Sequence, residues 1–366
     1  MGSVQMSSGR LGAWAGGLAL GVVLALSLWW VERYRWAGGF RAIRPHFAGA
    51  CRAIDGLRGP EDITVDPSTG IAYISAYDRG AGPGEPASGA LYAYPLNRPN
   101  SEPTNLTPDA GPDFRPHGIS LYRHPDGEKK LFAVNHADAG HGIEIFSLAG
   151  AALEHERTIR HPALSAPNDL VAVDASRFYV TNSSRHDGGW LGWLEEAFRL
   201  DLANVLYYDG AVFSEAIGGL GAPNGINVDH HGEEVYVASA FDQAVHIYGR
   251  DAATGALAPK RRVSLGSRLD NVEVDGRGAL WVAARARFLD GPQPSQVFRI
   301  ALAPGATPQV DEIYLNDSEE LANSSVAAVY GRRLLIGSSR EHGFLDCLME
   351  REPLSPRIPT HAEHGP

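Results

Sequence analysis

The feature of this sequence that most constrains its fold is a pattern that recurs six times along the chain. Each copy consists of a short polar pair, an apolar run, a turn usually marked by Gly or Asp, and a second apolar run. Successive copies are 56, 51, 56, 46 and 54 residues apart, counted from the first residue of each pair: Glu61, His117, Asn168, Asn224, Asp270 and Ser324. A period of about 50 residues with several short strands in each unit is typical of a β-propeller, so six copies predict six blades.

Further apolar runs between the copies, such as GALYAYPL and QVFRIAL, are expected to form the outer strands of the blades. This spacing leaves no room for a helix after every strand, which excludes an α/β fold. The predicted fold class is therefore all-β, a six-bladed β-propeller over residues 36–350. Residues 1–35 are expected to form a separate hydrophobic anchor, and residues 351–366 a flexible tail.

The polar pairs predict two rings of side chains, because the innermost strands of a propeller run along a central channel. The first ring contains the six residues named above, and the second contains the residues that follow them: Asp62, Gly118, Asp169, Gly225, Asn271 and Ser325. Buried carboxylates are costly unless they are paired or bind a cation. Asp, Glu and Asn oxygens suit Ca²⁺, whereas zinc would require clustered His or Cys. The alternative is that the pairs only cap the strands and hydrogen-bond across the channel.

The charge of the chain excludes one class of partner. Its formal net charge is −11 at pH 7. Binding to the phosphates of nucleic acid needs a basic surface, so no nucleic-acid partner is expected. An acidic chain can instead gather carboxylates around cations.

The N-terminal region contains an apolar segment of membrane length. Residues 11–31 are 21 positions without a charge, bounded by Arg10 and Glu32. As a helix this segment would be about 32 Å long, which is enough to cross the apolar core of a bilayer. A cleaved signal peptide is the alternative, but the following WWVERYRW contains no small-residue cleavage site. We expect an uncleaved transmembrane or signal-anchor helix.

Two cysteines, Cys51 and Cys347, bracket the six repeats. They are either unrelated buried thiols or a disulfide that joins the two ends of a circular fold. A disulfide implies an oxidising compartment, and hence a periplasmic or extracellular propeller. Four arginines soon after the apolar segment instead favour a cytoplasmic propeller, because the positive-inside rule would keep these arginines on the cytoplasmic side of the membrane. We expect the disulfide and an extracytoplasmic body on a membrane anchor.

Several stretches, taken in order, resemble the paraoxonase/arylesterase family of calcium-dependent six-bladed propellers. They are GPEDI, PHGIS, VNHAD, PNDLVAV, NGIN, DNVEVD and SSVAAVYGRRLLIG, within about residues 50–348. Cys51 and Cys347 lie where that family has its closing disulfide. The resemblance implies hydrolysis of lactones and aryl esters.

The resemblance also implies two calcium ions stacked in the channel. A catalytic ion would be held by the first set of donors: Glu61, Asn168, Asn224, Asp270 and Asn271. A structural ion would be held by Asp62, Asp169 and the backbone carbonyl of Ile119. Adjacent members of a polar pair would therefore serve different ions.

The catalytic histidines of the family correspond to His117, in PHGIS, and His136, in VNHAD. One would take a proton from water while the other holds its tautomer. Activation of water by the cation alone needs the same neighbours and is the alternative. The other histidines, His141 among them, are expected to be structural or at the surface.

Three places depart from the family and are expected to line the substrate wall. The chain has TNSSRHDGG where the family has TNDH, Arg285 where the family often has His, and Ala222 where it has an aromatic residue. The chemistry can therefore be retained while the substrate range differs, and phosphotriester turnover is not expected.

A segment near residues 190–202 has apolar side chains at helical spacing. They are Trp190, Leu191, Leu194, Phe198 and Leu202, with Glu195 and Glu196 on the opposite face. We expect a helix that either packs on the top of the propeller or contacts a membrane or substrate.

The sequence thus predicts a membrane-anchored, calcium-dependent hydrolase of small-molecule carboxylic esters. Three alternatives remain. They are a gluconolactonase-like propeller with one metal, a strictosidine-synthase-like propeller with a different reaction, and a non-enzymatic interaction propeller stabilised by calcium. The pair Glu61–Asp62, repeated as Asn168–Asp169, favours two ions and the hydrolase.

Overall fold

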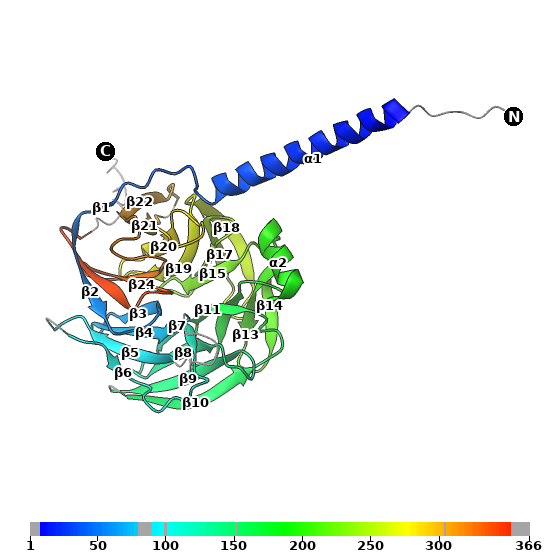
Figure 1. Cartoon of the computed structure of the whole chain (residues 1–366). Helices are drawn as coiled ribbons and strands as arrows, with labels where there is room; N and C mark the ends of the chain where they lie inside the picture. Colours follow the sequence, from blue (N-terminus) through cyan, green and yellow to red (C-terminus); the bar gives the residue numbers. More distant parts are fainter. Residues whose placement is uncertain (1–7, 80–88, 99–100, 151, 304, 353–366) are drawn as a thin grey trace, which may run out of the picture.

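The computed structural model describes residues 8–79, 89–98, 101–150, 152–303 and 305–352. Within these residues, six antiparallel sheets surround a central axis (Figure 1). Five of the sheets have four strands, and one has five. The predicted all-β, six-bladed propeller is confirmed. Most of the expected C-terminal tail, residues 353–366, lies outside the described part.

Each blade runs from an inner strand at the axis to an outer strand at the rim. From the axis outward, the first two blades are β3 (Pro60–Asp66), β4 (Ile71–Tyr77), β5 (Gly89–Pro95) and β6 (Thr104–Asn105), then β7 (Pro116–Arg123), β8 (Lys129–Asn135), β9 (Gly142–Ala149) and β10 (Ala152–Arg160). The next two are β11 (Pro167–Ala172), β12 (Phe178–Asn182), β13 (Ala203–Tyr208) and β14 (Phe213–Leu220), then β15 (Pro223–Val228), β16 (Glu234–Ser239), β17 (Ala244–Arg250) and β18 (Leu257–Ser264). The last two are β19 (Arg268–Val274), β20 (Leu280–Arg285), β21 (Ser295–Ala301), β22 (Gln309–Leu315) and β1 (His46–Phe47), then β23 (Ser324–Tyr330), β24 (Arg333–Ser338), β25 (Gly343–Met349) and β2 (Gly49–Asp55).

The apolar core lies between neighbouring blades. Phe132 of β8 packs against Phe178 of β12 in the next blade, with ring centroids 6.0 Å apart. Trp281 of β20 and Ile336 of β24, from the last two blades, belong to one apolar cluster, and both are fully buried. Full burial of such side chains contributes about 1.5–3 kcal/mol each, which favours the closed circle of blades over separate sheets.

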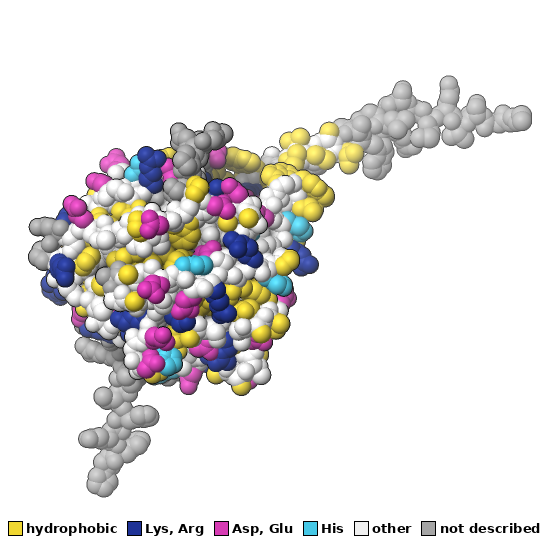
Figure 2. Space-filling view, turned by 90° about the horizontal axis from the view of Figure 1, so that it is seen from below, with side chains coloured by type: hydrophobic (Ala, Val, Ile, Leu, Met, Phe, Trp, Pro, Cys, Tyr) yellow, Lys and Arg dark blue, Asp and Glu magenta, His cyan; other side chains and the backbone are white. Residues whose placement is uncertain are grey.

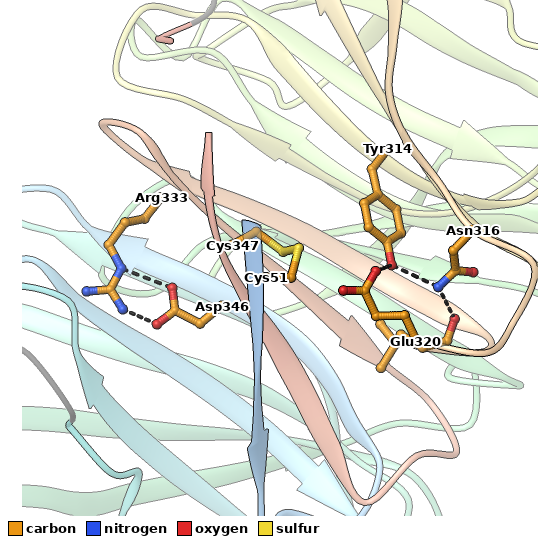
Figure 3. The surroundings of a disulfide bond; sticks show 8 residues. Cys51, Tyr314, Asn316, Glu320, Arg333, Asp346 and Cys347 are labelled. Atoms are coloured by element: carbon orange, nitrogen blue, oxygen red, sulfur yellow. Dashed lines mark hydrogen bonds and ion pairs between the residues drawn. A yellow bond between two sulfur atoms is a disulfide. The ribbon is translucent and has the colours of Figure 1, made fainter. Parts of the chain in front are cut away.

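The circle is closed by pairing the N-terminal strand β2 with the C-terminal strand β25. Cys51 and Cys347 lie directly opposite each other in this pair and form a disulfide across 296 residues (Figure 3). The predicted disulfide is therefore confirmed. On the chain-entropy model, closing a loop of this length contributes at most about 5–6 kcal/mol. Beside it, Asp346 accepts hydrogen bonds from the guanidinium of Arg333, one of them 3.0 Å long.

Each of the six inner strands changes register with its neighbour at the predicted polar pair. In β11, for example, Pro167 pairs with Asn182 and Leu170 with Val180, so two residues on β11 face one on β12. A shift of one residue also occurs in β3, β7, β15, β19 and β23. A bulge inserts an extra residue, bends the strand and re-aims its side chains. The polar pairs therefore lie where the sheet pattern is interrupted.

Helix α1 (Ser8–Trp36) projects from the propeller, and its last turns dock on it (Figure 1). Its stretch Gly17–Trp36 is long and apolar enough to cross a membrane, and none of it is buried in the body. Hydrophobic side chains gather where the helix meets the body, whereas acidic and basic side chains are mixed over the rest of the visible face (Figure 2). Two arginines hold this end of α1 on the body. Arg33 of α1 donates to the carbonyl of Ala197, and Arg199 of the body donates to Glu32 of α1.

Helix α2 (Gly189–Phe198) lies between β12 and β13, within the third blade. The expected helix at this position is present, but it interrupts a blade and does not join two of them. Its Trp190 and Trp193 are 70% and 65% exposed, whereas Glu195 is buried. The Glu195 carboxylate accepts hydrogen bonds from Ser184 and from the backbone of Arg185. The helix therefore turns its aromatic side outward and uses Glu195 to hold the preceding loop.

Candidate metal centre and active site

Four buried oxygen atoms near the start of the inner strands have no hydrogen-bond partner among the described residues. They are Glu61 Oε2 and the Oδ1 atoms of Asn168, Asn224 and Asn271. A buried acceptor without a partner costs about 1–3 kcal/mol. All four residues belong to the donors predicted for the catalytic ion. We call these residues together with Asp270 the mouth set.

Two arginines reach the carboxylates of the mouth set. Arg79 Nη1 lies 3.0 Å from Glu61 Oε2 as an ion pair without hydrogen-bond geometry, and Arg285 donates to Asp270 Oδ2. In the described part of the chain, no three His, Cys, Asp or Glu side chains gather closely enough to hold a metal by themselves. A cation here would therefore depend on the Asn oxygens, and such a neutral and anionic oxygen set suits Ca²⁺.

The second member of the first pair, Asp62, is satisfied by the backbone. Its Oδ1 accepts from its neighbour Ile63 N–H at 2.9 Å, and its Oδ2 accepts from Ile119 N–H of β7 at 2.7 Å. The carboxylate thus ties β3 to the inner strand of the next blade. The proposed ligand atom of Ile119, its carbonyl, belongs to the same residue that makes this bond.

Asp169 repeats the arrangement. Its Oδ1 accepts from Leu170 N–H at 2.7 Å, and its Oδ2 accepts from Ile226 N–H of β15 at 2.8 Å. The neighbouring strands approach closely because they carry Gly118 and Gly225, and a Cβ at Gly118 would lie only 2.4 Å from Asp169 Oδ1. We call Asp62 and Asp169 the inner pair.

The buried carboxylates of the channel repel one another. Burial raises the pKa of Glu61 to about 7, against the opposing charge of Arg79. Burial also raises the pKa of Asp62 to about 7, against the hydrogen bond from Ile119. Burial and the charge of Asp62 raise the pKa of Asp169 well above its usual range. The channel therefore requires protons or a cation to neutralise it.

Glu273 is an acidic residue of the channel that the sequence pattern did not single out. Burial and the charge of Asp62 raise its pKa well above its usual range. It lies 3.5 Å from Thr64 Oγ1 and 3.3 Å from Asn227 Nδ2, on the walls of a hollow of about 730 Å³ at the far end of the channel. It occupies the third position after Asp270, so extending the ring pattern by two residues would have found it.

His117 lies beside the mouth set. Its Nε2 is 3.4 Å from Glu61 Oε1, and Arg79 contacts both ring nitrogens, Nδ1 most closely. Burial lowers the pKa of His117 well below its usual range, and the charge of Arg79 adds to this effect. The imidazole is therefore neutral at neutral pH, with its two nitrogens facing Arg79 and Glu61.

His136 lies next to His117, with ring centroids 4.9 Å apart in an edge-to-face arrangement. Its Nδ1 is 3.0 Å from Nδ1 of His141, and His141 Nε2 is 3.2 Å from Asp187 Oδ2. Burial and the neighbouring His141 lower the pKa of His136 to about 3. The structure thus brings the two predicted histidines together. It adds His141, which was expected to be structural or at the surface, and Asp187 of the stretch TNSSRHDGG.

One hollow is lined by residues of the mouth set, and a second, larger one shares Arg268 with it. One of about 460 Å³ is lined by Asn168 and Asn224, by Ser184 of the departing loop, and by Arg268. A larger one of about 1070 Å³ is lined by Arg268 and Arg285 and by the last turns of α1. A small molecule can therefore reach Asn168 and Asn224 from the side of the two helices.

These features define a class: a closed six-bladed propeller with an oxygen-rich channel whose mouth holds a neutral histidine pair. The Arylesterase family model matches residues 44–348. Among curated proteins, the chain is 32% identical to rat serum paraoxonase/arylesterase 2 over 307 residues (79% of this chain, 86% of the relative). It is 31% identical to human serum paraoxonase/arylesterase 1 over 322 residues (81% of this chain, 88% of the relative). The chain belongs to the arylesterase family.

Solved structures show the same fold at low identity. A candidate gluconolactonase matches with a TM-score of 0.54 at 17% identity, over 86% of this chain and 97% of the other. A calcium-binding regucalcin from Agrobacterium tumefaciens matches with a TM-score of 0.51 at 17% identity, over 85% of this chain and 99% of the other. At such identities the likeness concerns the fold of the propeller.

Proposed function

We propose that this protein is a calcium-dependent hydrolase of carboxylic esters whose substrates are lactones and aryl esters. The observation that carries the proposal is the group of four buried oxygens in the mouth set that have no hydrogen-bond partner among the described residues. Membership of the arylesterase family supports ester hydrolysis as the reaction, and the names of the relatives include arylesterase.

In this proposal the mouth set holds a catalytic Ca²⁺ ion, and the inner pair with the Ile119 carbonyl holds a structural one. When bound, the catalytic ion polarises the ester carbonyl and stabilises the negative charge that develops on its oxygen. Asn168 and Asn224 line the hollow that receives the substrate, so they orient the ester beside the ion. Glu61 and Asp270 supply the negative charge that attracts the calcium ion.

His117 is proposed to take a proton from the attacking water, with the ring of His136 packed against it. A neutral imidazole is what a general base requires, and burial keeps both rings neutral. Since Arg79 contacts Nδ1 and Glu61 faces Nε2, His117 can accept a proton only when Arg79 releases Nδ1. Arg79 is therefore proposed to shift toward substrate or Glu61 during turnover.

The propeller is proposed to be extracytoplasmic and held at a membrane by α1. The disulfide indicates an oxidising compartment, and the stretch Gly17–Trp36 has the length and composition of a membrane span. Trp29 and Trp30 on α1, and Trp190 and Trp193 on α2, are exposed at the end of the molecule where α1 leaves the body. Aromatic side chains at this position suit the membrane–water interface.

The test is hydrolysis of phenyl acetate and of a δ-lactone, with and without a calcium chelator. The proposal predicts turnover of both substrates, loss of both on chelation, and recovery on adding Ca²⁺ back. Equal turnover in the chelated enzyme would exclude calcium dependence, and absence of turnover of either substrate with calcium present would exclude the hydrolase.

A further inference from the structure

The hollow of about 1070 Å³ beside the mouth set has a charge unlike that of the whole chain. Its described lining contains four arginines and only two acidic residues, although the net charge of the protein is −11. The arginines are Arg33, Arg268, Arg285 and Arg340. Trp29, Trp30 and Phe288 supply an apolar wall. The hollow therefore combines an aromatic surface with positive charge.

Arg268 is a mostly buried charge whose carboxylate partner is distant. Its side chain is 21% exposed, and its carboxylate partner, Glu196, lies 3.8 Å away and is itself 62% exposed. The guanidinium stacks on Phe288, with its carbon 3.5 Å from the ring centroid. Stacking on an aromatic face is weaker than the cost of removing a guanidinium from water. A planar cation held rigidly with poor neutralisation is prepared for an anion.

Arg285 lies directly opposite Arg268 on the neighbouring strand. Like charges directly opposite each other in a sheet are destabilising, so this placement requires a compensating contact. Arg285 uses one nitrogen on Asp270, but its buried Nε has no hydrogen-bond partner among the described residues.

The two arginines are connected to the reaction centre. Arg268 also lines the smaller hollow that contains Asn168 and Asn224. Arg285 contacts Asp270 of the mouth set directly. A molecule whose ester group lies at Asn168 and Asn224 can therefore present its other end to Arg268 and Arg285.

We propose that Arg268 and Arg285 form an anion subsite, and that this protein selects esters or lactones that carry a carboxylate or phosphate on the side away from the scissile bond. The inference rests on the proposed ester hydrolysis and deepens it, because it names the substrate class. Guanidinium groups bind carboxylate and phosphate with paired, charge-assisted hydrogen bonds, whereas a neutral group leaves them unpaired. The competing explanation is that Arg268 serves only to hold Phe288 and α2 in place.

The test compares two acetates of equal shape: 4-carboxyphenyl acetate, which is anionic, and 4-carbamoylphenyl acetate, which is neutral. We expect kcat/KM to be about tenfold higher for the anion, mainly through KM, and the ratio to fall in high salt. Arg268→Gln should bring the ratio close to one, and Arg268→Lys should restore part of it. Arg261→Gln, at an exposed arginine of β18, is the matched control and should leave the ratio unchanged.

Calorimetry provides a measurement that does not need turnover. Wild-type protein should bind 4-hydroxybenzoate about tenfold more tightly than 4-hydroxybenzamide, and Arg268→Gln should remove the difference. Two results would overturn the anion subsite without affecting the proposed hydrolase. One is equal kcat/KM for the two acetates in wild type, and the other is an unchanged ratio of these values in Arg268→Gln. If no ester is hydrolysed, the proposed function fails, and the calorimetric comparison alone decides whether the anion subsite exists.

Discussion

On β3 and β11 a member of the mouth set directly precedes a member of the inner pair, yet the oxygens of the two side chains differ in their hydrogen bonds. Both oxygens of Asp62 and of Asp169 accept backbone hydrogen bonds, within a strand and across to the next blade. Glu61 and Asn168, the residues just before them, each keep a buried oxygen without a partner among the described residues. On these two strands the first member of the polar pair therefore keeps an oxygen without a hydrogen bond, and the second member is held by the backbone. The hydrogen bonds of the inner pair join neighbouring blades, whereas the mouth set keeps acceptors that the proposed catalytic ion would occupy.

The largest expected effect is on activity, from Glu61→Gln. The amide keeps the shape of the side chain but removes the negative charge from the mouth set. We expect phenyl acetate turnover to fall by about 10²–10³-fold, the usual consequence of weakening a group that stabilises developing charge. The melting temperature should change less than the activity, because Glu61 Oε2 accepts no hydrogen bond from the described residues and the substitution removes only its ion pair with Arg79. Glu154→Gln, an exposed position on β10, is the control. Turnover within threefold of wild type would remove the distinction between the mouth set and the inner pair.

Substitution of His117, the histidine next to the mouth set, should also lower activity. His117→Gln removes the proposed base and should lower kcat by about 10²-fold or more, while calcium binding persists. His136→Gln should be milder, about tenfold. Because the pKa of His136 is lowered to about 3, its ring stays neutral above about pH 4, so calcium-saturated wild type should show no loss of activity from this group between pH 5 and 8. Near-normal turnover in His117→Gln with intact calcium would remove His117 as the base.

The inner pair should affect stability first. In Asp169→Asn only one side-chain oxygen remains as an acceptor, so one of the amides of Leu170 and Ile226 loses its partner. We expect the free energy of unfolding to fall by about 2–3 kcal/mol. The loss should persist in chelator, since these hydrogen bonds do not involve a cation. A variant that is destabilised only when calcium is present would show that the inner pair acts chiefly as a metal ligand.

The smallest expected effect is a pH dependence of calcium stabilisation. Burial raises the folded-state pKa of Glu61 from 4.5 to about 7, so without metal this group favours folding below about pH 4.5, and that contribution is lost as pH rises toward 7. A cation neutralises the carboxylate and removes this loss. The increase in melting temperature on adding Ca²⁺ should therefore grow from pH 5 to pH 8, and grow less in Glu61→Gln. A calcium shift that is independent of pH would contradict the assignment.

Much of the architecture was accessible from the sequence, because the six repeats are local patterns with a constant period. The polar pairs and the bracketing cysteines follow from the same period. The residues that contact the two catalytic histidines could not be predicted from this period. Arg79 and His141 come from loops, so their contacts with His117 and His136 depend on how the blades pack. The helical spacing placed Glu195 opposite the apolar side chains but did not say which side faces the propeller. The burial of Glu195, which accepts from the amide of Arg185, decides this.

Equilibrium dialysis against Ca²⁺ tests most directly whether the mouth set holds a calcium ion of its own, separate from the ion proposed at the inner pair. The proteins to compare are wild type and Asn224→Leu, in which the side chain has nearly the same shape but no oxygen. We expect wild type to bind two tight ions and Asn224→Leu to lose one of them while remaining folded. Equal calcium content and affinity in the two proteins would contradict a calcium ion in the mouth set.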